Sequence, residues 1–438
     1  MKRISILSLV AFAAAFHPAS AQSLKECIET ALENNYEMHL VRNQEQIVHN
    51  NATWANAGAL PTLDATAAYR PSANTFERTT PRSSGPTITE HGGFDNTLSA
   101  GVTLNWTIFD GFKIQTTHRQ LLLLEKQSET ATRMAVEDLV AGIASEYYNC
   151  VQQQIRLANY HSTMELSREQ LRIAQLNYDI GRFSGLEYQL ARSDFHNDSS
   201  AFVRQDKAVA TSQIRLNQLM ANPDLNHPLL ISDTAIIVRT DLLLPTLLEH
   251  TLQGNSSILY AQQNSQMAEL DYKKILSRNY PYLKLSGQYG YDATSYGKGT
   301  TRSRSNLAFS GGLTVGFNIF DGNRKRERKN AELTIRNQEI LLEQLRFDLQ
   351  AQLTECYQAY RTNIELLTLQ RENLKIVQQT YDSALERYKL GDLSGLDLRQ
   401  VQQNLLTAEE QVLQAEYEAK MSEITLLLIS GDIDHYLI

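Results

Sequence analysis

The feature that most constrains this chain is a stretch of about ninety residues that occurs twice. Residues 98–185 return as residues 307–395, about 210 positions later. Each copy contains the string Phe-Asp-Gly, at 109–111 and 320–322, and the string Tyr-x-x-Gly-x-x-Ser-Gly-Leu, at 178–186 and 388–396. One matching pair of short strings could arise by chance, but two pairs in the same register indicate an internal duplication.

Between the two strings of the first copy lies a long uninterrupted helical stretch. Residues 112–180 contain no proline and a single glycine, Gly142. At 1.5 Å per residue such a helix is roughly 100 Å long. A helical hairpin, a bundle or a tube can hold a rod of that length, whereas a compact globular domain cannot.

Before each Phe-Asp-Gly string the residues alternate between apolar and polar, which is the period of a β-strand. The apolar positions of the two copies are Val102, Leu104, Trp106 and Ile108, then Leu313, Val315, Phe317 and Ile319. The polar positions are Thr103, Asn105 and Thr107, then Thr314 and Asn318. Asp110 and Asp321 follow the strands, and we expect them to be N-caps of the long helices because a short carboxylate accepts the free N–H groups of a first turn.

The remaining segments are also duplicated. We expect helices over 24–58 and 242–278, each stopped by a proline and followed by a strand, and further helices over 184–221 and 394–430. The Ser-, Thr- and Gly-rich segments 71–96 and 292–306 are expected to be loops. Because the two shorter helices of a half together match the long one, each half is predicted to be a coiled pair of one continuous rod and one jointed rod.

These elements predict the following organisation of the chain. The segments are a signal peptide (1–21), a first repeat (22–221), a linker near the joints (222–240), a second repeat (241–431) and a C-terminal tail (432–438). The signal is predicted because Lys2 and Arg3 precede an apolar run and Ala19-Ser20-Ala21 precedes Gln22. The setting of Cys27 does not suggest a lipid anchor.

Composition argues against several classes of function. The formal net charge of −8 disfavours nucleic acid as a partner. The cysteines Cys27, Cys150 and Cys356 are odd in number and are interpreted as small packed residues, with no metal or cofactor site implied. No catalytic motif or phosphate loop is present, so we do not expect an enzyme.

Four strands with one apolar and one polar face match the pattern of a membrane β-barrel, although a soluble sheet packed on a helix is an alternative. Four strands cannot close a barrel, since about eight are needed and eight leave the interior filled by side chains. Three chains would supply twelve strands, enough to enclose water. A conduit therefore favours a trimer.

The duplicated strings, together with Pro-Thr-Leu at 61–63, Pro-Tyr-Leu at 281–283 and the helical start at 24–35, resemble the TolC-like outer membrane efflux proteins. The resemblance covers residues 22–431. It implies an α+β membrane protein: a homotrimer with a twelve-stranded β-barrel in the lipid of the outer membrane, continued by a twelve-helix tunnel through the periplasm. Such proteins are exit ducts for inner-membrane pumps or type I secretion machines, joined through a periplasmic adaptor.

The resemblance also implies roles for individual residues. A gate at the helix tips would involve Asp397, Glu187 and the position of Gln400, although Glu187 and Asp397 could equally be helix-capping carboxylates. Leu393 stands where a basic latch residue is expected, so the family's latch does not transfer; Arg182, Arg192 and Arg399 are possible substitutes. The tips that would dock the adaptor are Gly181, Ser184, Gly185, Leu186, Gly391, Ser394, Gly395 and Leu396, and the barrel-to-helix junctions are Asp110, Gly111, Asp321 and Gly322.

The alternative function is a secreted coiled-coil adaptor or structural interaction protein. An adaptor should carry one hairpin between β-rich flanks, whereas here each of two hairpins starts from a pair of strands. The sequence does not identify the transported substrate or the class of pump.

Overall fold

The computed structural model describes residues 22–73, 77–80, 88–91, 93–181, 184–297, 301–390 and 392–436. The predicted signal peptide, Arg182 and Gly391 lie outside these residues. The chain divides into two compact units, which are considered separately: unit 1 is Met1–Val41, Thr132–Ser256 and Arg346–Ile438, and unit 2 is Arg42–Ala131 and Ser257–Leu345.

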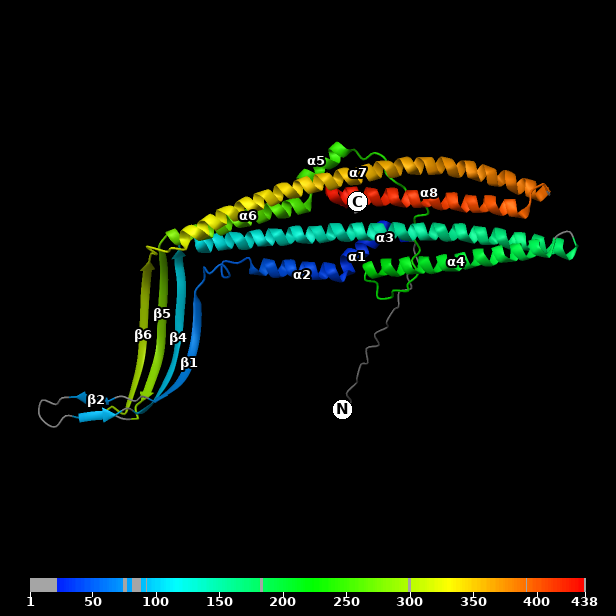
Figure 1. The fold of residues 1–438 in the computed structure, drawn as a ribbon. Helices are drawn as coiled ribbons and strands as arrows, with labels where there is room; N and C mark the ends of the chain where they lie inside the picture. The colour runs from blue at the N-terminus through cyan, green and yellow to red at the C-terminus, as the bar shows by residue number, and fades with distance from the viewer. Residues whose placement is uncertain are drawn as a thin grey trace, which may run out of the picture. The chain divides into compact units, whose positions relative to one another are not determined.

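Long helices dominate the described chain (Figure 1). The two longest, α3 (Lys113–Asp179) and α7 (Arg324–Leu390), have 67 residues each, as expected from the uninterrupted stretch. The others are α1 (Leu24–Asn34), α2 (Tyr36–Asn51), α4 (Gly185–Leu219), α5 (Leu244–Gly254), α6 (Ser256–Leu276) and α8 (Gly395–Ser430), with 3₁₀ turns η1 (Ser277–Asn279) and η2 (Ile433–Tyr436). The predicted C-terminal stop of α8 is correct, because Gly431 adopts the left-handed conformation, φ 77°, that glycine accommodates.

The segments 24–58 and 242–278, each predicted as one helix, are both broken. The first is α1 and α2, separated by Asn35 and ending at Asn51, and the second is α5 and α6, separated by Asn255. Asn35 donates from Nδ2 to the carbonyl of Leu219 at 2.9 Å, and Asn255 donates to the carbonyl of Ile429 at 2.9 Å. The two breaks are therefore built in the same way. In each, the asparagine side chain donates a hydrogen bond to a carbonyl in the last turn of another helix, α4 for Asn35 and α8 for Asn255.

Unit 2 contains an antiparallel sheet in the order β1-β4-β5-β6. Its strands are β1 (Thr62–Ala73), β4 (Phe94–Asp110), β5 (Tyr282–Ser295) and β6 (Ser303–Gly316). The strand register places apolar side chains beside apolar ones and polar beside polar. One cross-strand row is Ala65, Val102, Tyr289 and Phe309, and the next is Asp64, Thr103, Gln288 and Ser310. The predicted apolar and polar faces of the sheet are therefore present.

Three details of the strands differ from the prediction. The segments predicted as loops are not simply loops. Residues 71–96 contain the end of β1, a two-stranded hairpin of β2 (Glu77–Thr80) and β3 (Ile88–His91), and the start of β4, while 292–306 contains the end of β5 and the start of β6. The last strand, β6, ends at Gly316, so Phe317 and Ile319 lie beyond it. An irregularity between Thr107 and Phe109 takes Ile108 out of the pairing.

The two strand-to-helix junctions, both in unit 2, are less alike than their sequences. Asp110 does not directly precede α3, but its carboxylate accepts from the N–H of Ile114 in the first turn at 3.0 Å. Asp321 instead accepts from the N–H of Asn323, ahead of α7, so the expected N-cap role is not seen there. Gly111 has φ 70° and a side chain on it would collide with the carbonyl of Ser277, whereas Gly322 has ordinary space around it.

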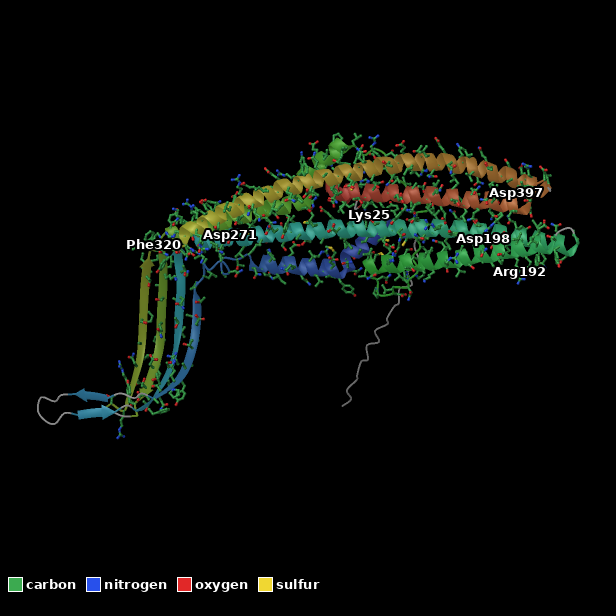
Figure 2. The ribbon with its side chains drawn as sticks, in the orientation of Figure 1. Lys25, Arg192, Asp198, Asp271, Phe320 and Asp397 are labelled. Carbon is green, nitrogen blue, oxygen red and sulfur yellow. The ribbon has the colours of Figure 1, made fainter. Side chains whose placement is uncertain are left out.

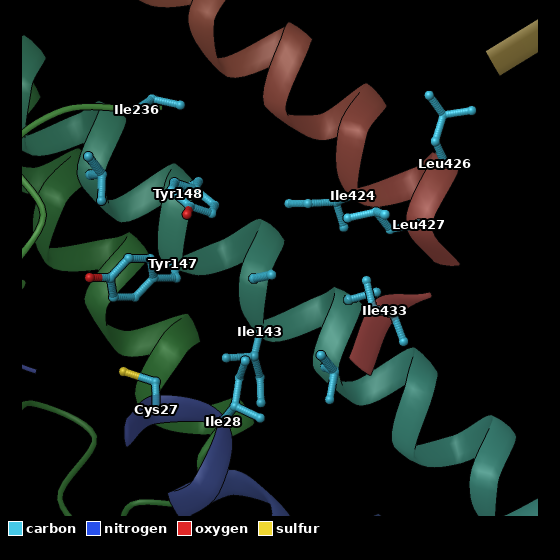
Figure 3. Close-up of a cluster of buried hydrophobic side chains, with 14 of the residues drawn as sticks. Cys27, Ile28, Ile143, Tyr147, Tyr148, Ile236, Ile424, Leu426, Leu427 and Ile433 are labelled. Atoms are coloured by element: carbon cyan, nitrogen blue, oxygen red, sulfur yellow. The ribbon is translucent and has the colours of Figure 1, made fainter. Parts of the chain in front are cut away.

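The core of unit 1 joins residues from distant parts of the sequence (Figure 3). Cys27 and Ile28 from α1 pack with Ile143 and Tyr147 from α3, and the same cluster includes side chains from α8. Cys27 and Cys150 are both buried, and burial raises the pKa of each thiol to about 12. These two cysteines are thus packed residues of low reactivity, as the sequence indicated.

The linker between the repeats is held by hydrogen bonds from several helices of unit 1. Gln213 of α4 donates to the carbonyl of Leu229, and Tyr147 of α3 lies 3.3 Å from the hydroxyl of Ser232. The N–H of Arg239 donates to Glu423 of α8 at 2.9 Å. The linker is therefore a structured segment and not a flexible tether.

Candidate gate and docking tips

The first helix tip, between α3 and α4, is shaped by glycine and by a capping box. Gly181 has φ 74°, and its N–H donates to the carbonyl of Tyr178 at 2.9 Å. Ser184 caps α4 by accepting from the N–H of Glu187, and the Glu187 carboxylate accepts from the N–H of Ser184 at 2.8 Å. The capping role weighed for Glu187 is thus present, and it fixes the position of this carboxylate.

The second tip, before α8, uses the same cap with one change. Ser394 accepts from the N–H of Asp397 at 3.1 Å, and its hydroxyl donates to the Asp397 carboxylate at 2.7 Å. The shorter side chain of Asp397 pairs with the Ser394 hydroxyl instead of closing the box on the backbone. Gln400, one turn further along, is exposed and donates to Asn404.

Tyrosine rings lie over the glycines that begin α4 and α8. A Cβ on Gly185 would be 3.7 Å from Cε2 of Tyr178, and one on Gly395 would be 3.9 Å from Cε2 of Tyr388. Burial raises the pKa of Tyr388, and the negative charge of Glu187 adds to the effect. Glu187 of the first tip therefore lies close enough to the end of α7 to act on it electrostatically.

Exposed apolar side chains surround both tips. Leu186 is 68% exposed and Leu396 is 74% exposed, at matching positions of α4 and α8. Ile180 and Leu390, at the ends of the preceding helices, are also largely exposed. Large apolar groups on a tip do not stabilise one copy of the chain, and such a patch is typical of a protein-binding surface.

A buried ion-pair cluster lies behind the tips, and of its members the sequence predicts a role only for Arg399. The Arg399 guanidinium of α8 makes two hydrogen bonds to the Asp198 carboxylate of α4, of 2.6 and 2.7 Å, and one of 3.2 Å to Ser167 of α3. Asp194 lies 3.8 Å from the same guanidinium. The hydrogen bonds to Asp198 raise the pKa of Arg399, and burial raises the pKa of Asp194.

The cluster joins three helices of unit 1, and Figure 2 labels one of its members, Asp198 on α4. Arg399 is one of the three arginines that the sequence offers as substitutes for the latch, but the sequence does not identify its partner, because Asp198 is 201 residues away. Of the other two, Arg192 is exposed on α4 and Arg182 lies outside the described residues.

Amide pairs continue the connection between α3 and α8 away from the cluster. Gln170 donates to Gln402 at 3.1 Å, and Gln152 donates to Gln414 at 3.1 Å. Gln402 is 2% exposed, so its amide is removed from water. Gln402 accepts through its carbonyl oxygen only, and its buried Nε2 has no hydrogen-bond partner among the described residues. The two pairs favour one register of α3 and α8, because sliding either helix would break them.

Two further properties concern the described residues as a whole. They contain no group of three His, Cys, Asp or Glu side chains placed to hold a metal ion. None of their helices is both long enough and apolar enough to cross a membrane.

Comparison with known proteins places this geometry in a family. Residues 27–222 and 247–432 match the family described as outer membrane efflux protein. The chain belongs to the outer membrane efflux protein family. Members of this family are outer membrane proteins that extend into the periplasm, and this is the location of the present chain.

Solved structures with the same fold are distant in sequence. The CmeC outer membrane channel of Campylobacter jejuni has a TM-score of 0.73 at 18% identity, over 93% of this chain and 85% of that one. The outer membrane protein VceC of Vibrio cholerae has a TM-score of 0.70 at 15% identity, over 93% and 96%. The MtrE outer membrane channel of Neisseria gonorrhoeae, in an open state, has a TM-score of 0.68 at 16% identity, over 94% and 89%. Among curated protein sequences, none matches this chain.

Proposed function

We propose that three copies of this efflux protein form the outer membrane exit duct of a tripartite efflux pump or a type I secretion system. The observation that carries the proposal is the four-stranded sheet with one apolar face, whose edge strands β1 and β6 each lack a second partner strand in the described part of the chain. An unpaired edge in a membrane leaves backbone N–H and C=O groups without partners, at several kcal/mol each. Joining β6 of one copy to β1 of the next removes both edges and gives twelve strands.

The helices support the same assembly. On α7, Leu333, Ile340 and Phe347 follow one another at intervals of seven residues and are all exposed by more than half. A heptad stripe is the seam of a coiled coil, and within one copy this seam lacks a partner helix in the described residues. In the proposed trimer, a helix from the next copy covers the stripe and the helices form a twelve-membered tunnel.

Gating at the tips is the second part of the proposal. Three copies would bring Asp397 and Glu187 together in a negatively charged neck, with Gln400 one turn behind. The Arg399–Asp198 pair would hold α8 against α4 and so keep the neck narrow. Opening would require this pair to break, which makes Arg399 the latch in place of the family position occupied here by Leu393.

Docking of the periplasmic adaptor, which links the duct to an inner-membrane pump, is assigned to the tips themselves. The contacting residues would be Gly181, Ser184, Gly185 and Leu186 of the first repeat and Gly391, Ser394, Gly395 and Leu396 of the second. The exposed leucines supply apolar area that is unfavourable in water, and the glycines allow a partner helix to approach closely.

The proposed function is tested by reconstitution. The mature protein, purified in detergent, should have the mass of a trimer by native mass spectrometry and should give small, discrete conductance steps in a planar lipid bilayer. A monomer that remains in the aqueous phase after detergent removal would support the secreted adaptor instead.

A further inference from the structure

The second long helix begins with a basic run, residues 324–329. Five of the first six residues of α7 are basic: Arg324, Lys325, Arg326, Arg328 and Lys329. The equivalent residues that begin α3, 113–118, contain a single lysine and no arginine. Cations at a helix N-terminus oppose the helix dipole, so the basic run is locally unfavourable. Because α3 starts without such a run, the fold does not require one.

Acidic residues around the start of α7 are fewer than the basic ones. Where α6 ends and α7 begins, residues 271–281 and 317–332 contain eight Lys or Arg and four Asp or Glu. The α3 side of the junction, residues 109–120, adds two basic residues and one acid. At this end of the sheet, Lys284 on β5 and Asp64 on β1 offset each other. The junction between strands and helices therefore carries an excess of positive charge, although the whole chain has a formal net charge of −8.

Part of the basic run has no acidic partner. Glu327 pairs with Arg278 of η1 at 2.6 Å, and Glu332 pairs with Arg328 at 3.2 Å. Three exposed cations of the run have no carboxylate partner among the residues that the structure describes: Lys325, Arg326 and Lys329. Their charge is therefore available to an anionic partner.

Large apolar side chains lie directly ahead of the basic run. Phe317, Ile319 and Phe320 connect β6 to α7, and the last two are 88% and 86% exposed. Phe112 and Tyr280, at the neighbouring connections between strands and helices, are half-exposed. Phe320 is labelled in Figure 2, where the strands meet the helices. Exposed aromatic and apolar side chains followed by Lys and Arg are typical of a membrane–water interface.

We propose that the basic run of α7 binds the headgroups of anionic phospholipids in the periplasmic leaflet of the outer membrane. The inference rests on the proposed function, because α7 starts at this surface only if the sheet crosses the membrane. From Arg324 to Lys329 the helix rises roughly 8 Å, which is comparable with a headgroup layer of roughly 5–8 Å. Lipid phosphates at this position also offset the unfavourable charge of the helix start. The bound lipids anchor the duct at a fixed depth in the membrane.

The test is native mass spectrometry of the detergent-purified protein, equilibrated with equal amounts of phosphatidylglycerol and phosphatidylcholine that have the same acyl chains. We expect at least about fivefold more bound phosphatidylglycerol than phosphatidylcholine, the gain that one cation near an anionic surface supplies. The variant K325Q/R326Q/K329Q should lower this preference below about twofold. The variant K325R/K329R keeps the positive charge and should keep the preference.

A matched control removes the same number of cations from the same helix. R361Q/K375Q/K389Q changes three exposed residues of α7, the nearest of them roughly 55 Å along the helix from Arg324. Because these positions are beyond the reach of the headgroups, the control variant should keep the wild-type preference for phosphatidylglycerol.

The possible failures are distinguishable. A trimer that conducts, but in which K325Q/R326Q/K329Q keeps the preference for phosphatidylglycerol, would overturn the lipid site and leave the duct intact. If that variant instead changes only the ion selectivity of the duct in a planar bilayer, the basic run faces the lumen and the lipid site is wrong. An equal loss of preference in the control variant would show that net charge alone matters, which also overturns the site. A protein that is monomeric by native mass spectrometry would overturn the duct and, with it, the position of the basic run at a membrane.

Discussion

At the scale of single residues, the tips combine an exposed carboxylate with a buried guanidinium. The Asp397 carboxylate accepts a hydrogen bond from the Ser394 hydroxyl, and the Glu187 carboxylate accepts one from the N–H of Ser184, so both are held at the starts of α8 and α4. Arg399, only two residues beyond Asp397, is mostly buried and paired with Asp198. In the proposed duct the exposed acids would act on passing ions, and the buried arginine would hold α8 against α4.

Replacing Arg399 by alanine should weaken the closed state. The variant loses both hydrogen bonds to Asp198 and leaves that carboxylate buried without its partner, which costs about 3 kcal/mol when the pair is buried. We expect larger conductance steps in planar bilayers and a lower melting temperature. Asp194→Asn is the matched control, because Asp194 lies further from the guanidinium and burial already disfavours its charge. Equal conductance of wild type and Arg399→Ala would remove Arg399 from the gate.

Replacing Asp397 by alanine should reduce the response of the duct to cations. Three carboxylates around a narrow neck attract divalent and polyvalent cations, which then obstruct the passage. We expect weaker block by multivalent cations added on the periplasmic side, and lower cation selectivity. Gln400→Ala, a neutral change one turn away, should conduct and block like the wild type. If Asp397→Ala is blocked as strongly as the wild type, the narrowest part of the duct lies elsewhere.

At the scale of elements, the sequence predicts the type of almost every segment but not where some of them end. The helices α3 and α7 were predictable because one period persists over many turns. The breaks at Asn35 and Asn255 were not, since a single residue interrupts the period and its partner carbonyl is distant in sequence. The signal was nevertheless present, because an asparagine occupies the equivalent position in both repeats.

The joints should be sensitive to these asparagines. Asn255→Leu leaves the carbonyl of Ile429 without its donor in a buried position, which should cost about 1–3 kcal/mol. Asn35→Leu should cost less, because Asn35 is only partly buried. The melting temperature of the detergent-solubilised protein measures both. Asn34→Leu, which changes an exposed neighbour, is the control and should have the melting temperature of the wild type. If Asn255→Leu also has the wild-type melting temperature, the joint does not depend on its asparagine.

The two faces of the sheet should respond differently to charge. Leu104 lies in a row with Leu63 and Gly287 on the apolar face, whereas Thr103 lies in a row with Asp64 and Gln288 on the polar face. An arginine facing lipid near mid-membrane costs about 2–4 kcal/mol, while one facing the lumen remains hydrated. Leu104→Arg should therefore reduce the amount of trimer in the outer membrane, and Thr103→Arg should not. Equal assembly of the two variants would contradict the assignment of the faces.

At the scale of the whole molecule, the two repeats are not identical. The first repeat carries the extra hairpin β2–β3, and the cluster around Arg399 draws its arginine from the second repeat and its acids from the first. The family and the duplicated architecture were recognisable from the sequence. The pairing of Arg399 with Asp198 was not, because a contact across 201 residues leaves no local pattern.

Charging both tip leucines should separate transport from assembly. Leu186→Asp combined with Leu396→Asp places two carboxylates on surfaces that are already exposed, so folding should be unaffected. If these tips receive the adaptor, the double variant should form normal amounts of trimer but confer no more resistance to toxic compounds than a strain lacking the protein. Gln189→Asp with Gln403→Asp, at exposed positions on the same two helices, is the control. Loss of trimer in the leucine variant would show that the leucines serve folding instead.

The linker, residues 222–240, contacts both the first and the last helical segments of unit 1, so its contacts limit when this unit can fold during export. Gln22, close to the start of the described chain, pairs with Ile231 of the linker, and Glu423 near its end holds Arg239 of the same linker. Ile433, from the final turn, is fully buried in the cluster that also contains Ile28. The helical unit therefore cannot close until nearly the entire polypeptide has been translocated.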